Sequence, residues 1–342
     1  YFGNRQEGRF SIGEWVVATS SYRPPELVYR LAFDIDGRGE YEVRQRCMGL
    51  QEPGWRRKPD PPVLPFGIAS LREDFGGILR YSYCTPDFVA GTLMLDARPI
   101  EDWSGSALQN RWQGVIFRGH PDARIVPECT VPDPSTNPRG DIYNAHWSVQ
   151  KKGAMIVQML RPGLSRETKD SRVWISSAGL SVPVEEDGWV FVESEGAYAA
   201  LCVVGVHPER GRGSGYIWDA AEDETNGRWL RCREPLSPVV IDVSRKAEHA
   251  DFKSFRALAG SGRVDVTATT VCYETLAGHT LTLHTDYGRL PEVDGDPIDL
   301  APDRVYDSPF IQSGWDSGIV ELRYAGLERV LDFSLSGNDS ER

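Results

Sequence analysis

The feature that most constrains the fold of this chain is the recurrence of short apolar runs separated by turn residues. Typical runs are ILRYSYCT, AMIVQML, WVFVES, PVVIDVS and HTLTLHT, which are rich in β-branched and aromatic residues. Clusters of Gly, Pro, Asp and Asn, which favour turns, lie between them. Such spacing is typical of antiparallel strands joined by short connections. The sequence therefore predicts an all-β protein, a large antiparallel β-sandwich with many strands in two stacked sheets.

Two segments have helical rather than strand spacing. Residues 24–34 begin with proline and continue with apolar residues at helical spacing, and residues 248–259 place three apolar side chains on one side. We expect both helices to be short and peripheral. Residues 51–65 are rich in proline and charge, which predicts a linker. We therefore expect an N-terminal segment at 1–65, with the remnant of an upstream domain as one interpretation, and a sandwich domain at 66–342.

The charge balance excludes some classes of partner. The 342 residues include 38 basic and 50 acidic side chains, a net charge of −12. A general nucleic-acid binder needs a basic surface to displace phosphate counterions, and docking on an anionic membrane needs one too. No apolar run is long enough to span a bilayer, and no signal-peptide pattern is present. We expect neither nucleic acid nor membrane as a partner.

The six cysteines are widely spaced and include no CxxC pair. This spacing argues against a zinc knuckle or a redox motif. Cys84, Cys202 and Cys272 lie within apolar, strand-like runs, so we expect buried free thiols that pack as small hydrophobes. The cysteines leave the cellular compartment open.

The stretch QNRWQGVIF at 109–117 combines a strand-like pattern with an unusual polar row. Alternation along a strand places Gln109, Arg111 and Gln113 on one face. A row of two amides around a guanidinium is consistent with a solvated outer face of a sheet. It is equally the kind of surface that binds a polar, anionic ligand, because arginine can hold a carboxylate through two hydrogen bonds.

A second alternating stretch, IYNAHWSVQ at 142–150, places its polar residues on one face, namely Asn144, His146, Ser148 and Gln150. Amides and hydroxyls of this kind bind sugar hydroxyls, while aromatic rings cover apolar sugar faces. A solvated strand face is again the alternative. Tyr143 and His146 would suit proton transfer in β-elimination on a uronate. Alternation points them to opposite faces unless a bulge intervenes.

Metal and cofactor motifs are weak. VDGDPID at 293–299 resembles a fragment of a calcium loop but lacks the spacing of an EF-hand, so an Asp-Gly hairpin is the preferred interpretation. The histidines outside 142–150 lie in turns or face opposite sides of a strand. We predict no cofactor, with a structural zinc or calcium ion as an open alternative. Paired carboxylates for glycoside hydrolysis cannot be located from sequence, because that role depends on their separation in space.

Three stretches resemble the C-terminal β-sandwich of heparinase II/III-like and related (α/α)-toroid polysaccharide-processing enzymes. They are YCTPDFVAGTLML followed by QNRWQGVIF, DGWVFVESEGAYAALCVV, and YDSPFIQSGWDSGIVELRYAGLERVLDF. The resemblance is one of pattern across much of 78–333. It implies a substrate cleft between the sandwich and a helical toroid, with tyrosine and histidine as base and acid and with nearby polar residues neutralising the uronate. It also implies that Asn110, Arg111 and His146 belong to such a site, although this chain contains no toroid.

Two functional hypotheses follow. In the first, the protein acts on a polysaccharide or oligosaccharide, as a lyase or as a glycoside hydrolase. Arg111 would then neutralise a uronate, His146 and Tyr143 would transfer protons, and the remaining polar residues would bind sugar hydroxyls: Gln109, Asn110, Gln113, Asn144 and Gln150. In the second, it is a non-catalytic glycan-binding or structural module that works with a separate helical domain or self-associates. A glycan-active protein would favour a periplasmic or secreted location.

Overall fold

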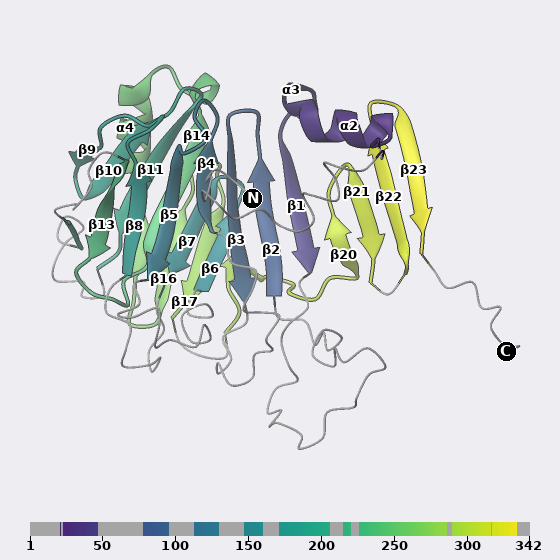
Figure 1. Cartoon of the computed structure of the whole chain (residues 1–342). Helices are drawn as coiled ribbons and strands as arrows, with labels where there is room; N and C mark the ends of the chain where they lie inside the picture. The colour runs from purple at the N-terminus through teal and green to yellow at the C-terminus, as the bar shows by residue number, and fades with distance from the viewer. Residues whose placement is uncertain are drawn as a thin grey trace, which may run out of the picture.

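A computed structural model describes residues 21, 23–46, 78–95, 113–129, 147–159, 171–205, 215–219, 226–285, 289–315 and 317–333. Within them, strands form three antiparallel sheets, and the helices are short (Figure 1). The predicted all-β sandwich is therefore confirmed. None of the helices in this part of the chain has the length and apolar character needed to cross a membrane.

The largest sheet has twelve strands and forms one face of the molecule. In spatial order they are β12 (Tyr216–Trp218), β13 (Gly227–Cys232), β8 (Ser171–Ser176), β5 (Arg124–Cys129), β4 (Gly114–Phe117), β3 (Phe88–Leu95), β2 (Ile78–Cys84), β1 (Tyr41–Arg46), β20 (Arg304–Asp307), β21 (Ile311–Gly314), β22 (Ile319–Tyr324) and β23 (Leu327–Asp332).

Two smaller sheets complete the strand layers. The six-stranded sheet has the order β6 (Trp147–Lys151), β7 (Ala154–Gln158), β14 (Val239–Arg245), β11 (Ala197–Val203), β10 (Trp189–Glu193) and β9 (Val184–Glu186). The five-stranded sheet has the order β15 (Val264–Val266), β16 (Thr270–Glu274), β17 (Thr280–His284), β18 (Glu292–Val293) and β19 (Asp296–Pro297).

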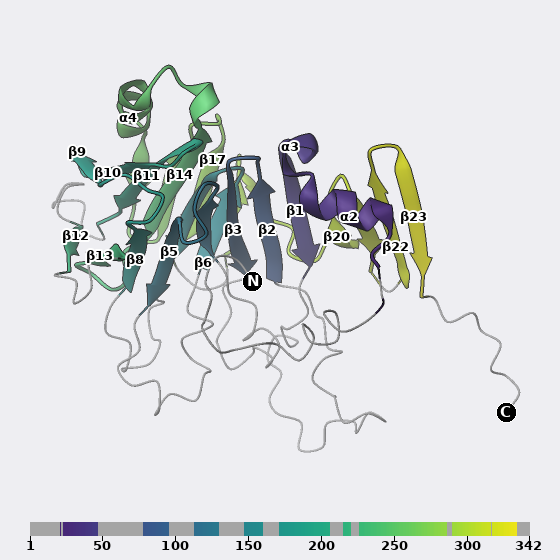
Figure 2. The same ribbon diagram turned by 45° about the horizontal axis from the view of Figure 1, so that its top comes forward.

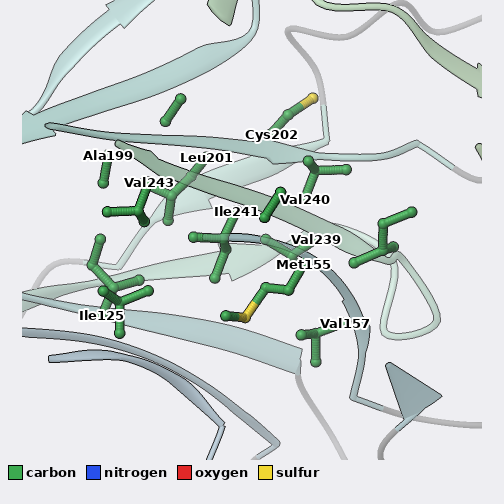
Figure 3. Packing of buried hydrophobic residues seen from close by; sticks show 14 of the residues in the cluster. Ile125, Met155, Val157, Ala199, Leu201, Cys202, Val239, Val240, Ile241 and Val243 are labelled. Atoms are coloured by element: carbon green, nitrogen blue, oxygen red, sulfur yellow. The ribbon is translucent and has the colours of Figure 1, made fainter. Parts of the chain in front are cut away.

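The six-stranded sheet is the middle layer, so the structure adds a third sheet to the two that the sequence predicts. Its residues Met155 and Ile241 lie across from Ile125 of the large sheet (Figure 3). On its opposite face, Asp242 accepts a hydrogen bond from Tyr273 of the five-stranded sheet. Coverage on both faces explains why β11 and the start of β14 are unbroken apolar runs rather than alternating ones.

Strands β1 and β20–β23 extend the large sheet beyond the middle layer (Figure 1). Helix α2 (Glu26–Phe33) contacts β22 and β23 and buries Leu27 there. Short α3 (Ile35–Arg38) follows. Because β1 pairs with β2 along its whole length, the chain on either side of the predicted boundary at residue 65 shares one sheet. The boundary itself lies outside the described residues.

The second predicted helix and the predicted hairpin are both present. Helix α4 (Phe252–Gly260) follows a 3-10 turn, η6 (Lys246–Glu248), and begins with a capping box between Asp251 and Ser254. It packs Phe255 onto the middle layer. Asp294 and Gly295 both have positive φ and join β18 to β19, which confirms the Asp-Gly hairpin.

Candidate active site

Most of the residues that the sequence assigns to a site lie outside the described residues: Gln109, Asn110, Arg111, Tyr143, Asn144 and His146. Their proposed roles stay predictions. The structure places the remaining two, Gln113 and Gln150, and it places both of them inside the sandwich.

Gln113 lies just before β4 and is buried on the same face as Val115 and Phe117. Its side-chain amide donates a hydrogen bond of 3.2 Å to the carbonyl of Pro127 in β5. Gln113 therefore alternates with its neighbours as the sequence indicates, but its side chain lies in the core. The difference has a physical cause, since Pro127 lies beyond the residues that pair β4 with β5 and the Gln113 amide supplies a donor to its carbonyl.

Gln150 has a similar role in β6. Its Oε1 accepts a hydrogen bond of 2.9 Å from the Thr92 hydroxyl, and its Nε2 donates to the carbonyls of Ala90 and Lys152 at 3.1 and 2.9 Å. Ser148, on the same strand, donates to the carbonyl of Leu93 at 2.7 Å. The polar face of β6 therefore joins the middle layer to β3. Gln150 holds the two sheets together instead of facing a ligand.

A different polar cluster lies at the end of the sandwich where β2 turns into β3. We call it the Arg245 cluster. Figure 2 shows the ribbon of β2, β3 and β14, which reach this end of the sandwich. Arg245 ends β14, and η6 follows directly with Glu248. The other members come from the approach to β1, from β2 and from the β2–β3 turn, and they are Glu40, Tyr83 and Asp87.

Arg245 connects all three carboxylates of the cluster. Its Nε donates to Asp87 Oδ2 at 2.6 Å, and its Nη1 donates to Glu40 Oε1 at 3.0 Å. Its backbone N–H and its guanidinium both favour the charged form of the Glu248 carboxylate. The Tyr83 hydroxyl donates to the second oxygen of Glu40 at 2.8 Å. These contacts fix the orientation of Glu40 from two sides.

The two glutamates of the cluster differ in proton affinity. The pKa of Glu40 lies below its usual range, chiefly because of the Tyr83 hydrogen bond and with help from Arg245. The pKa of Glu248 lies above its usual range, because partial burial disfavours its charged form and because the Glu40 carboxylate is close. Both side chains reach solvent. The two shifts separate the pKa values, so between them there is a range of pH in which an ionised Glu40 lies beside a protonated Glu248.

The cluster carries slightly more negative than positive charge when all its groups are ionised. Glu40, Asp87 and Glu248 oppose Arg245 and the ammonium of Lys152, which acts on both glutamates. An anionic group placed directly on the cluster would therefore meet no unpaired guanidinium. A neutral ligand fits this balance better.

Asp242 lies on β14, and its carboxylate interacts with that of Glu248. Asp242 Oδ2 accepts hydrogen bonds of 2.9 Å from the Tyr273 hydroxyl and from the backbone N–H of Leu276. Burial raises the pKa of this carboxyl to about 6 despite those donors. Asp242 joins the middle layer to the five-stranded sheet and has no access to solvent.

His284 of β17 and His279, just before that strand, each lie close to a carboxylate. His279 lies 2.8 Å from Asp294, and buried His284 lies 2.9 Å from Glu292. Among the described residues, no group of three His, Cys, Asp or Glu side chains is placed to hold a metal ion. The side chains of Cys84, Cys202, Cys232 and Cys272 are thiols rather than disulfides.

Comparisons with protein families, with curated proteins and with solved structures found no match. The resemblance to heparinase II/III-like sandwiches therefore stays a prediction. Sequence reasoning missed the Arg245 cluster because its members are separated by long stretches of chain. The only sign of the cluster in the sequence was the large number of Asp and Glu residues, which does not show where they meet.

Proposed function

We propose that this protein is a carbohydrate-active enzyme that hydrolyses a glycosidic bond with Glu248 and Glu40 as its two carboxyl groups. The observation that carries the proposal is the opposite displacement of their pKa values beside one arginine. Glycoside hydrolysis needs a carboxylic acid that keeps its proton and a partner that stays ionised. Environments that push two such pKa values apart commonly mark acid and base roles.

The roles follow from the contacts. Glu248, protonated, would donate its proton to the leaving glycosidic oxygen. Glu40, held ionised by Tyr83 and Arg245, would stabilise the positive charge that develops on the sugar, or would activate water. Asp87 would position Arg245 through its 2.6 Å hydrogen bond.

Hydrolysis is favoured over β-elimination by the charge of the site. Elimination from a uronate needs a cation that neutralises the substrate carboxylate as charge develops. Arg245 already binds two carboxylates of its own. We therefore propose a neutral sugar at the bond that is cleaved.

A non-catalytic module that works with a separate helical domain is the second candidate. Helix α2 favours it, since Tyr29 and Phe33 are both exposed and their rings contact each other at an angle, with centroids 4.8 Å apart. A row of exposed tryptophans would favour direct glycan binding. In the described part of the chain Trp189 is buried and Trp174 packs against Trp229, while Trp315 is 40% exposed with the Arg46 guanidinium over its ring.

The proposal is tested by mass spectrometry of products after incubating the purified chain with neutral and uronate-containing polysaccharides. Hydrolysis adds the mass of water to each cleaved bond, whereas elimination leaves an unsaturated end. Products with added water, formed from a neutral polysaccharide, would support the proposal. Unsaturated products would move the function to a lyase, and the absence of cleavage across the panel would favour the non-catalytic module.

A further inference from the structure

A small surface pocket lies where β8 ends, away from the Arg245 cluster. Its volume is about 130 Å³. The residues that line it combine hydroxyls, aliphatic groups and one guanidinium, and those used below are Ser176, Ser181, Leu180, Val182, Pro183 and Arg228. The pocket thus brings together one cation, hydrogen-bonding hydroxyls and an apolar wall.

Arg228 is the charged group of the pocket. It is exposed on β13 and pairs with no carboxylate among the described residues. The two glutamates that follow the pocket loop already have partners. Glu185 accepts from Tyr216 and Trp218, and Glu186 pairs with Arg256. Within the part of the chain that the structure describes, no carboxylate competes for this guanidinium, so it is available to hold an anion.

Two serines of the pocket are placed to act as donors. The Ser176 hydroxyl accepts a hydrogen bond of 3.1 Å from Trp174 Nε1, and the Ser181 hydroxyl accepts one of 3.0 Å from the backbone N–H of Glu193. Because each hydroxyl oxygen already accepts a hydrogen bond, the hydroxyl proton can be donated to a ligand. Guanidinium and hydroxyl protons together favour a ligand that offers only acceptors.

The size and the rim of the pocket indicate how large the bound group is and which apolar part of the ligand it contacts. Pockets for drug-sized molecules usually enclose roughly 300–1,000 Å³. This one is smaller, so it suits a substituent rather than a whole molecule. Leu180, Val182 and Pro183 form an apolar wall, and Val182 is 76% exposed. We propose that the pocket binds the carboxylate or sulfate substituent of an acidic sugar, with the sugar ring against this wall.

The pocket lies at the same end of the sandwich as the Arg245 cluster. Gly179 of the pocket loop approaches His120, and Gly119 approaches Glu195 in the β10–β11 turn. Arg118, in turn, donates its backbone N–H to the carbonyl of Asp87 in the cluster. An acidic substituent held here would be separated from the carboxylate pair by the β4–β5 turn. The inference goes beyond the proposed function and does not depend on hydrolysis.

Binding by the intact chain can be measured by saturation-transfer NMR and calorimetry with four probes: glucuronate, glucose 6-sulfate, glucose and inorganic sulfate. We expect an acidic sugar to bind more tightly than either glucose or sulfate alone. Arg228→Gln should weaken that binding by about tenfold or more, because a charge-assisted hydrogen bond is lost. Val182→Asp, which places a negative charge on an exposed rim, should weaken it as well.

Arg233→Gln is the matched control, since Arg233 is an exposed arginine just beyond the other end of β13. It should leave binding unchanged. Equal binding of glucose and glucuronate would overturn the proposal. So would undiminished affinity in Arg228→Gln, or sulfate binding that matches the acidic sugars. Because binding is read directly, a failure here is distinct from an absence of hydrolysis.

Discussion

Glu40 and Glu248 both interact with Arg245, yet their pKa values are displaced in opposite directions. The causes differ between the two carboxyls. The hydrogen bond from the Tyr83 hydroxyl, with a further one from the Arg245 side chain, lowers the pKa of Glu40, whereas partial burial and the nearby Glu40 carboxylate raise the pKa of Glu248. Two glutamates on one surface thus acquire the distinct acid–base characters on which the proposed chemistry depends.

The first prediction concerns the pH profile of hydrolysis. The activity requires Glu40 ionised and Glu248 protonated, so kcat/KM should follow a bell-shaped curve. Both glutamates start from an ordinary pKa of 4.5, so the acidic limb should lie below pH 4.5 and the basic limb above it. In Glu248→Gln the basic limb should disappear from any residual activity. A basic limb that survives in this variant would exclude Glu248 as the acid.

The second prediction concerns Tyr83, which is the largest cause of the low pKa of Glu40. Tyr83→Phe removes the 2.8 Å hydrogen bond and keeps the ring in place. The acidic limb of the profile should therefore move to higher pH. Loss of one hydrogen bond to a charged group should also reduce the free energy of unfolding by about 1.5–3 kcal/mol. An acidic limb that stays in place would contradict the role assigned to Tyr83.

The third prediction concerns the pH dependence of stability. The pKa of Asp242 is about 6 in the folded protein and 3.8 as an unperturbed group, so the folded state binds its proton more tightly. This contribution is fully present below about pH 3.8 and is lost as the pH rises through 6. The loss amounts to about 3 kcal/mol at 1.36 kcal/mol per pKa unit.

Asp242→Asn tests this directly, since asparagine cannot titrate and keeps an oxygen acceptor for Tyr273. Urea unfolding between pH 4 and 7 should show a smaller decline in stability for the variant than for the parent chain. Identical declines would mean that Asp242 does not carry this pH dependence.

The fourth prediction separates the core from the extension of the large sheet. Ile241→Ala removes a fully buried side chain from the interface between two sheets, and it should cost about 2–5 kcal/mol of unfolding free energy. Ile319→Ala makes the same change on β22, where the side chain is 36% exposed, and should cost much less. Denaturant titration of both variants measures the difference. Comparable losses would mean that β22 is packed as tightly as the middle layer.

The sequence predicted the elements well, because local patterns determine them. The β11 and β14 runs, both helices and the Asp294–Gly295 turn were each visible in a few consecutive residues. The third sheet was not visible, since an unbroken apolar run shows that both faces are covered but not by which strands.

The site was harder to predict, because the polar face of a strand can either bind a ligand or satisfy backbone groups inside the core. Gln113 and Gln150, which the sequence placed in polar rows, are buried and donate hydrogen bonds to backbone carbonyls. The Arg245 cluster depends on how the middle layer lies against the large sheet. That arrangement brings Arg245 to Glu40, which is 205 positions away in the sequence. A contact over such a separation cannot be predicted from the spacing of neighbouring residues.

The most direct test of the central claim is hydrolysis of a neutral polysaccharide in water enriched in oxygen-18, with products analysed by mass spectrometry. The parent chain should place one heavy oxygen in each cleaved bond. Glu248→Gln and Glu40→Gln should each reduce the rate by about 10²–10⁴-fold. Glu195→Gln, an exposed glutamate at the same end of the sandwich, should not reduce it. Heavy-oxygen products formed at the parental rate by Glu248→Gln would contradict the account.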